Sequence, residues 1–342
     1  MISIFSKRTL PRNFFLNSAF VMLLIIAPLL SSTPEAGTRS SSLKPLEYNH
    51  GQLVKMAVIG YIAPPRIGDS PYRIDPDGKL HVLPATGSIT YNFRSGDSAI
   101  NIAGDHVEPA VTLYNLGSTN SRSSPESRGL NTLSCIGNKV RVLTGEAKGA
   151  EGWVIGKHGG SEHVMVDFAD NEVFDKLTIE DKMQIYAIGV GLKLLNVEGV
   201  KAMNVSPHFL DMLSKAGMGV TDKGKLCIPV THRIPAKIMG SGLGSNQVYR
   251  GDYDIQLFDE KSVKEYKLET LRFGDIVAII NADHSYGRIY REGAISIGVI
   301  AHSRSSLAGH GPGVTTLFTS AGGNIELVIT PDANLAKLLN IR

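Results

Sequence analysis

Short apolar runs separated by turn-forming residues are the feature that most restricts the fold of this chain. Nearly all of them are bounded by Gly, Asn or Asp: LVKMAVIG, KVRVLTG, GWVIG, HVMVDF, MQIYAIGVG, KLCIPV, DIVAII, AISIGVIAH and IELVIT. Such runs are typical of strands in sandwiches and small barrels rather than in parallel α/β sheets. The 36 glycines, above the usual ~7% of a chain, agree with many tight turns. We therefore expect a mainly β (β-rich α+β) fold of several small barrels or sandwich-like sheets.

Three segments show the signals of short helices. The clearest is SPHFLDMLSKAG, where Ser206 can cap the first turn, Pro207 occupies its first position and Gly217 can end the helix. The second is EKSVKEYKLETL, and the third is the terminal DANLAKLLNIR, whose leucines fall on one helical face. The helices are thus expected to be few and short.

Residues 1–36 differ in composition from everything that follows. A basic KRTLPRN precedes the apolar stretch 14–30, whose polar interruptions are Asn17 and Ser18. This layout is typical of a secretory signal or a short membrane anchor, although SSTPEAG offers a poor cleavage site. Residues 37–50 resemble a linker. The protein is exported or anchored if the first segment is used, and cytoplasmic if the working protein begins after it.

The charge of the chain restricts its partners. The formal net charge is +3, and Lys7, Arg8 and Arg12 against Glu35 account for most of it, so the body is nearly neutral. Broad electrostatic capture of nucleic acid or acidic membrane is therefore not expected, and a membrane would be met only through the N-terminal segment. We expect a small-molecule ligand and a homo-oligomer. The two cysteines could form one disulfide in an exported chain, but they lack zinc-binding spacing.

The stretch GNKVRVLTGEAKGAEGWVIGKHGGSEHVMVDF, residues 137–168, resembles the KOW-type SH3-like barrel of ribosomal and transcription proteins. In that resemblance Gly145, Gly149 and Gly152 form the turn and the close strand crossing. Its lysines and arginine are matched by nearby carboxylates, so we interpret it as an architectural module over residues 135–172. Contact with RNA or a protein through this barrel, involving Lys148 and Lys157, is the alternative.

The order of several motifs is similar to that of the uncharacterised prokaryotic domain-of-unknown-function family 4438. These motifs are LVKMAVIG, HVLPATGSITYN, GDHVEP, SCIGNKV, GEAKGAEGWVIGKHGG, DHSYGRIYREGA and AGHGPGV. The resemblance covers about residues 51–342 and implies a mostly β fold interrupted by the barrel, with no established activity. It divides the body into an N-terminal β part, 51–134, the barrel, 135–172, and a C-terminal β part, 173–342, which carries the candidate site. The N-terminal extension departs from the family.

The first cluster of chemically active residues is AGDHVEPAV, with Asp105, His106 and Glu108. In an extended segment His106 and Glu108 share one face, while Asp105 points away. An imidazole and a carboxylate together suit a metal site or a general base with its orienting partner. A turn aspartate beside a surface ion pair would give the same pattern.

The second cluster is NADHSYGRIYREGA, which follows the apolar strand DIVAII. Asp283 and His284 are candidate catalytic residues at the strand end, and Tyr286 and Arg288 are candidate substrate-binding residues. Arg288 could hold a carboxylate or phosphate at two points. A charged hairpin end is the alternative interpretation.

The third cluster is the loop AGHGPGVTT. Its glycines and proline predict a shaped, stiff turn that fixes His310, and Gly311 and Gly313 are candidate substrate-binding positions. Because DIVAII, AISIGVIAH and GVTTLFT are expected to be neighbouring antiparallel strands, loops at alternate ends can meet.

A divalent metal is the cofactor that these clusters favour. His106, Asp283, His284 and His310 form a nitrogen and oxygen donor set suited to Zn²⁺, Mn²⁺ or Fe²⁺. No HxH or HExxH spacing is present, so histidines acting as acids, bases or anion donors without a metal remain equally open. A nucleotide cofactor is not expected, because MGSGLGS does not match a phosphate-binding loop.

Cys135, at the entry to the barrel, is a further candidate catalytic residue. A thiolate there would need a nearby cation to lower its pKa, and GKHGG could supply Lys157 or His158. A buried core thiol is the alternative.

Together these clusters predict an enzyme of the hydrolase or lyase type that acts on a small polar molecule, by hydrolysis or ring opening at a C–N bond. The alternatives are a non-catalytic binding module and an exported small-molecule binding protein.

Overall fold

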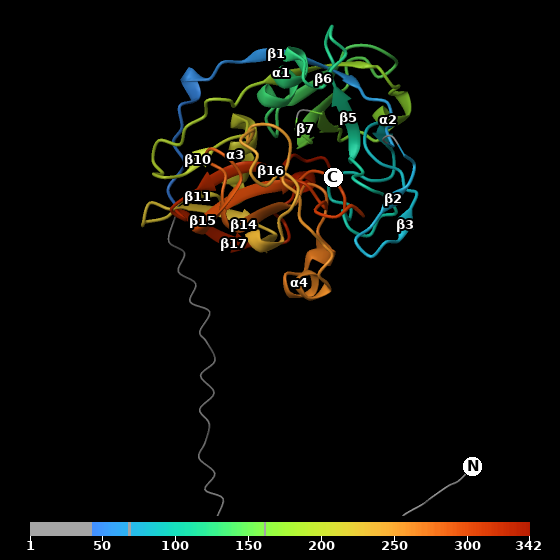
Figure 1. The fold of residues 1–342 in the computed structure, drawn as a ribbon. Helices are drawn as coiled ribbons and strands as arrows, with labels where there is room; N and C mark the ends of the chain where they lie inside the picture. Colours follow the sequence, from blue (N-terminus) through green and yellow to red (C-terminus); the bar gives the residue numbers. More distant parts are fainter. Residues whose placement is uncertain (1–42, 68–69, 161) are drawn as a thin grey trace, which may run out of the picture. The chain divides into compact units, whose positions relative to one another are not determined.

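Short strands joined by turns make up most of the structure, as the apolar runs predict. The computed structural model describes residues 43–67, 70–160 and 162–342 (Figure 1). The predicted signal or anchor segment, 1–36, and residues 37–42 of the predicted linker lie outside the described residues. The rest of that linker is bridged to the body, Lys44 to Val220 and Tyr48 to Leu194, because Leu46 and Tyr48 pack against the core.

Six antiparallel strands close into a barrel. Their order around it is β1-β9-β6-β7-β8-β5, and β1 pairs with β5 to complete the closure. The strands are β1 (Met56–Ile62), β5 (Ala110–Tyr114), β6 (Lys139–Val142), β7 (Glu151–His158), β8 (His163–Asp167) and β9 (Lys182–Ala187). The short strand β4 (Ile89–Thr90) extends it beside β5. A barrel is confirmed, but half of its strands come from outside residues 135–172, since three short strands cannot close on themselves.

A second sheet carries the C-terminal part of the chain, which runs from yellow to red in Figure 1. Its order is β10-β16-β15-β14-β13. These strands are β10 (Lys201–Ala202), β13 (His232–Pro235), β14 (Ile276–Asp283), β15 (Ile289–Ile300) and β16 (Val314–Ser320). The predicted meander of β14, β15 and β16 is confirmed, with antiparallel pairing throughout.

Smaller sheets complete the β structure. One has the order β11-β12-β17 and consists of β11 (Gly219–Val220), β12 (Leu226–Val230) and β17 (Ile325–Ile329). The hairpin of β2 (Arg73–Ile74) and β3 (Leu80–His81) lies near one edge of the molecule. One apolar core runs from the barrel into the C-terminal sheets, and a second surrounds Tyr253, Ile255 and Phe273.

The helices of the described residues are short. They are α1 (Pro125–Leu133), α2 (Glu172–Lys176), α3 (Pro207–Lys215), α4 (Glu260–Glu265) and α5 (Leu335–Leu338), with 3-10 turns at His50–Gln52, Ala236–Ile238 and Leu268–Thr270. α3 begins as predicted, with the Ser206 hydroxyl accepting from Phe209 N. α1, which the sequence analysis missed, has the same Ser-Pro start at Ser124 and Pro125 but a polar sequence.

Among the described residues, none of the helices has the length and apolar character needed to cross a membrane.

Candidate metal centre

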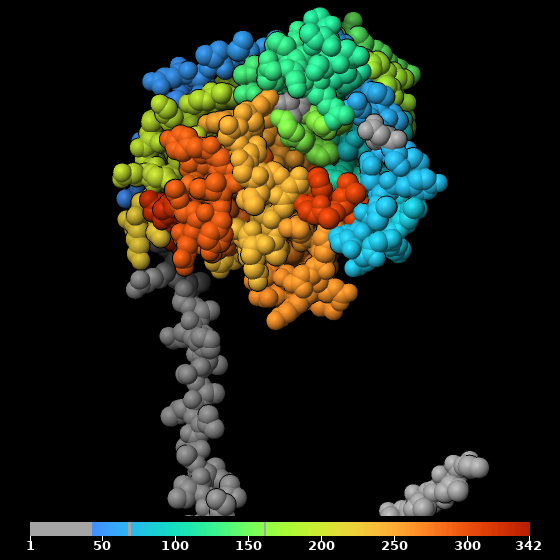
Figure 2. All heavy atoms as spheres, in the orientation of Figure 1, coloured from blue at the N-terminus to red at the C-terminus, as the bar shows by residue number. Residues whose placement is uncertain are grey.

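A cavity of about 630 Å³ gathers side chains from distant parts of the chain. It is lined by residues 66–67, 73, 85–86, 105–106, 122, 158–159, 162, 241, 252, 254, 307 and 310. Figure 2 shows the cyan, green and red-orange segments that contribute to it close together on one face. Loops from both parts of the chain, together with His158 at the end of β7, therefore build this cavity.

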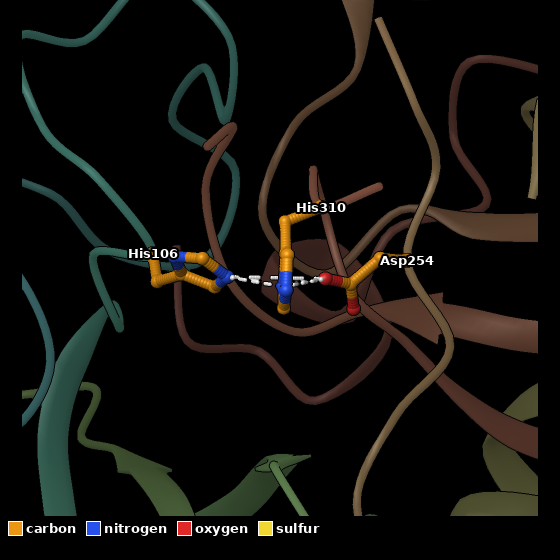
Figure 3. Close-up of side chains that lie close together, drawn as sticks. All are labelled: His106, Asp254 and His310. Atoms are coloured by element: carbon orange, nitrogen blue, oxygen red, sulfur yellow. Dashed lines mark hydrogen bonds and ion pairs between the residues drawn. The ribbon is translucent and has the colours of Figure 1, made fainter. Parts of the chain in front are cut away.

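Three of the lining side chains converge on one point (Figure 3). His106 Nε2 lies 3.1 Å from His310 Nδ1, and His310 Nδ1 lies 3.2 Å from Asp254 Oδ2. The third distance, from His106 Nε2 to Asp254 Oδ2, is 3.9 Å. His310 is the most exposed of the three, with 36% of its side chain accessible. The structure thus brings together His106 and His310, as predicted, and adds Asp254.

Asp105 orients the His106 ring. Its Oδ2 lies 3.2 Å from His106 Nδ1, while its Oδ1 accepts hydrogen bonds from Ser305 Oγ and Ser306 N at 2.9 and 2.8 Å. Burial raises the pKa of the Asp105 carboxyl, but the hydrogen bonds from His106 and Ser306 outweigh burial and hold it well below its usual value. An ionised Asp105 accepts the Nδ1–H of His106, which leaves the Nε2 lone pair facing Asp254 and His310.

The expectation that Asp105 points away from His106 is wrong. It assumed an extended segment, whereas His106 has φ 58°, in the left-handed region. That turn places both side chains toward the cavity. Glu108 points elsewhere.

A second group, His158, Asp252 and His302, lies deeper in the protein. His302 Nε2 is 2.7 Å from Asp252 Oδ2 and 3.6 Å from Asp254 Oδ1. The rings of His158 and His302 are 4.2 Å apart between centroids. Asp254 therefore faces the first group with one oxygen and this second group with the other.

Glu108 holds two histidines from inside the barrel. Its Oε1 lies 2.5 Å from His158 Nδ1 and 2.8 Å from His163 Nδ1. Its Oε2 accepts from Gly87 N at 2.6 Å and Thr112 Oγ1 at 2.9 Å. Burial opposes ionisation of Glu108, but the charges of His163 and His158 hold its pKa well below the usual value. Because both oxygens are fully used, Glu108 positions His158 rather than facing the cavity.

Neighbouring carboxylates favour a positive charge on His302. Burial alone would lower the pKa of His302, yet the carboxylates of Asp252 and Asp254 raise it well above its usual value. Burial likewise raises the pKa of Asp254, but hydrogen bonds with His302 and His310 bring it well below its usual value. The buried Asp254 carboxylate is thus stabilised in its ionised form by the positive charge beside it.

Asp283 and His284 do not join these groups. His284 is fully buried, with Nδ1 2.8 Å from Thr316 Oγ1 and its ring 5.3 Å from that of Tyr253. Burial lowers the pKa of His284 to about 3. Asp283 accepts from Ser285 and pairs with Arg291 at 2.8 Å. The strand end that carries them faces a different hollow, so they offer no atom to the cavity of His106 and His310.

The predicted substrate-binding residues are also divided. Tyr286 is 89% exposed and lines another pocket. Arg288 is buried, and its Nη2 donates to Arg250 O, so it does not reach the cavity surface. Gly311 and Gly313 follow His310 but are not among the residues that line the cavity, and close contacts at both positions require glycine. A Cβ at Gly311 would lie 1.6 Å from the Ile255 carbonyl oxygen.

Cys135 is a buried thiol. Burial raises its pKa to about 11, although Lys157 lies close enough to oppose this effect. Cys135 and Cys227 are both free, so the predicted disulfide is not formed. Lys157 is itself buried, with Nζ 2.7 Å from Asn204 Oδ1 and 3.0 Å from Tyr249 O. Because Lys157 is buried, it cannot contact RNA, as the alternative interpretation of the barrel proposed.

Four residues of the two triads were not predicted as site residues from the sequence: His158, Asp252, Asp254 and His302. The only local signal was the D-x-D pair in GDYDIQ, which lies after Gly251 and lacks a metal-binding motif. His302 lies two residues after the end of the apolar strand β15, so its sequence context is that of a core strand end.

Comparisons with known proteins agree with this fold. A family model described as domain of unknown function DUF4438, N-terminal, matches residues 72–211, and its C-terminal counterpart matches residues 215–339. The crystal structure of TM1086 is similar, with a TM-score of 0.77 and 44% sequence identity over 85% of this chain and 98% of that chain. A search of curated proteins gives no significant match.

Proposed function

The chain belongs to the DUF4438 family, and from that premise we propose that it is a metal-dependent enzyme that hydrolyses a small anionic molecule in the cavity. Zn²⁺, Mn²⁺ and Fe²⁺ are the cations that its nitrogen and oxygen donors suit. The family brings no activity with it, so the proposal depends on the arrangement of the chain's own residues.

The observation that carries the proposal is the triangle of His106 Nε2, His310 Nδ1 and Asp254 Oδ2. With sides of 3.1, 3.2 and 3.9 Å, it has a centre about 2.0 Å from each atom, which is the usual ligand distance for such metals. The donor set and the geometry therefore both fit a bound cation.

The residues around the triangle support the same role. Asp105 fixes the tautomer of His106, as carboxylates commonly do beside metal-binding histidines. The accessible His310 places the centre at the wall of the cavity rather than in the core. A cation held here supplies Lewis acidity and lowers the pKa of water.

Arginines on the cavity wall favour an anionic substrate. Arg66, Arg73 and Arg122 all line the cavity, and Arg122 pairs with Glu162. Arg73 Nε lies 3.6 Å from Asp105, so it links this wall to the metal centre. Arg66 lies in none of the ion pairs found among the described residues. A carboxylate or phosphate on the substrate would bind this wall and direct the rest of the molecule toward the triangle.

Hydrolysis or ring opening at a C–N bond is the proposed reaction. The oxygen of water forms the new bond to carbon, the C–N electron pair passes to nitrogen, and a proton from water follows it. A reaction of this type needs an activated water and a polarised carbonyl or amidine. One cation held by nitrogen and oxygen ligands could supply both.

Metal analysis with matched variants tests the proposal. We expect the purified protein to contain a divalent metal, and His310→Ala to lose at least tenfold in affinity for it, because a ligand is removed. His284→Gln, which changes a histidine outside the cavity, should keep the metal. The wild type should then hydrolyse members of a panel of cyclic amides and amidines that carry a carboxylate or phosphate, and the His310 variant should not.

Two results would count against this function. A protein that binds no divalent metal at micromolar concentration would overturn it. Binding of panel compounds without turnover, at equal affinity in wild type and His310→Ala, would support a small-molecule binding protein instead.

A further inference from the structure

We propose that a second divalent cation binds between His158, Asp252 and His302, so that the centre holds two metal ions. The Asp254 carboxylate bridges them. The proposal rests on the proposed function for the first ion, at His106, Asp254 and His310. The ligands of the second ion are other residues.

The first observation is a buried pair of unsatisfied atoms. His302 Nε2 and Asp252 Oδ2 lie 2.7 Å apart but without hydrogen-bond geometry, and neither has another hydrogen-bond partner. His302 is 0% exposed. Its Nδ1 donates to Ser303 O at 2.9 Å, so Nε2 is the atom that faces Asp252, and it offers a lone pair when a metal ion takes the place of its proton. Two lone pairs that face each other in the core are stabilised by a cation that both can reach.

His158 completes the donor set. Because its Nδ1 is held by the filled carboxylate of Glu108, Nε2 is its remaining ring atom. A carboxylate behind a histidine in this way is the usual support of a metal ligand. One ligand atom from each of His158, Asp252 and His302 lies within 4.8 Å of the other two, as ligands of one ion do.

Asp254 connects this group to the first. Its Oδ2 is 3.2 Å from His310 Nδ1, and its Oδ1 is 3.6 Å from His302 Nε2. One oxygen thus faces each group. In proteins that use two metal ions, the ions lie about 3.5–4 Å apart, a span that one bridging carboxylate can cover.

Gly313 keeps the space between these donors open. A Cβ at this position would lie 2.1 Å from Asp252 Oδ2 and 2.3 Å from His302 Nε2. Both distances are too short for contact with a methyl group, but they are usual between a metal ion and its ligands. The absence of a side chain at Gly313 therefore leaves room for an ion beside both atoms. A glycine here needs no left-handed backbone, because Gly313 is not among the residues with positive φ. Its lack of a side chain is instead explained by the donors that it faces.

Manganese binding to the full-length protein tests the second site. After chelation and dialysis, the protein is titrated with Mn²⁺, and the bound metal is measured by elemental analysis and by electron paramagnetic resonance. We expect two ions per chain and a spectrum of a spin-coupled pair, because the bridged ions are close. Asp252→Asn and Gly313→Ala should each bind one ion and give an uncoupled spectrum. Asp252→Asn keeps the shape of the side chain, and a circular dichroism melt of each variant checks its folding.

His310→Ala and His284→Gln complete the comparison. His310→Ala should retain one ion, in the second site, and His284→Gln should retain the coupled pair. One ion in the wild type that is lost in His310→Ala but kept in Asp252→Asn would overturn the second site and leave the proposed function standing. Absence of bound Mn²⁺ at millimolar metal in the wild type would overturn both.

Discussion

Single ring nitrogens decide what this centre can do. His106 uses Nδ1 on Asp105, His158 uses Nδ1 on Glu108, and His302 uses Nδ1 on a backbone carbonyl. Each ring therefore has its orientation fixed by one atom and presents the other as a donor.

The contribution of this orientation is testable at Asp105. Asp105→Asn removes the negative charge behind His106, and we expect the affinity of the first cation to fall about 10–100-fold, while the second site is unchanged. Competition with a chromogenic chelator measures both affinities. Asp283→Asn is the control, since that buried carboxylate bonds Ser285 and Arg291 outside the cavity. Equal losses in the two variants would contradict a positioning role for Asp105.

His284 predicts a pH dependence of stability. Burial and the charge of Arg288 lower its folded pKa to about 3, although Asp283 opposes them. The unfolded chain protonates near pH 6.5, so this contribution to stability is complete above that pH and is lost as the pH falls toward 3. Between pH 7 and pH 5, the metal-free wild type should lose about 2 kcal/mol more unfolding free energy than His284→Gln.

Urea unfolding in the presence of chelator, at both pH values, measures this difference. Because every other titrating group is common to the two proteins, only the His284 contribution remains. Parallel pH profiles for wild type and variant would show that the imidazole is not held neutral in the folded protein.

The centre forms where the hairpin of β7 and β8 meets the loop that carries Asp252. The turn between β7 and β8 begins at Gly159, whose N donates to Asp252 Oδ1 at 3.1 Å. The loop before Asp252 approaches so closely that a Cβ at Gly251 would lie 1.4 Å from Gly159 O. This backbone contact brings His158, from the barrel, against Asp252, from the C-terminal part of the chain.

Gly251→Ala tests that contact. Gly251 has φ 62°, so the substitution adds backbone strain as well as the clash with Gly159. We expect a lower melting temperature and loss of the second cation only. Gly244→Ala is matched, because Gly244 also has positive φ, 78°, but a Cβ there meets nothing within 4 Å. If both variants bind metal alike, the contact does not determine the site.

Elements were easier to predict from the sequence than the contacts between them. The meander of β14, β15 and β16 followed from apolar runs separated by glycine, and α3 followed from its Ser-Pro start. Barrel closure could not be predicted, because β1 pairs with β5 and β9, strands whose separation along the chain leaves no local signal. Long-range pairing of this kind depends on tertiary packing rather than on propensity.

The residues of the centre were difficult to predict for the same reason, because they come from distant parts of the chain. His106 and His310 could be proposed as partners because a glycine-rich turn fixes His310 and His106 lies in a cluster of chemically active residues, although 204 positions separate them. Asp254 and His302 could not, since neither lies in a turn or motif that signals a ligand. His284 was misplaced for a simple reason: alternate ends of a meander are close only when they lie at the same edge of the sheet.

Metal should stabilise the molecule as a whole. The residues matched by the N-terminal family model supply His106 and His158, and those matched by the C-terminal model supply Asp252, Asp254, His302 and His310. Both parts belong to one compact unit. A cation bound between them therefore stabilises the folded form of both, by about 2.7 kcal/mol at a free concentration 100 times its Kd.

We therefore expect chelation to lower the melting temperature of the protein in a single transition, and added Mn²⁺ or Zn²⁺ to restore it. Differential scanning calorimetry measures both effects. Asp254→Asn should show no metal-dependent shift of comparable size, because the bridging carboxylate faces both groups. His232→Gln, a histidine bonded to Thr231 and Thr270 outside the cavity, should shift like the wild type. A transition that splits in two on chelation would mean that the two parts fold independently, and a shift that persists in Asp254→Asn would place the stabilising metal elsewhere.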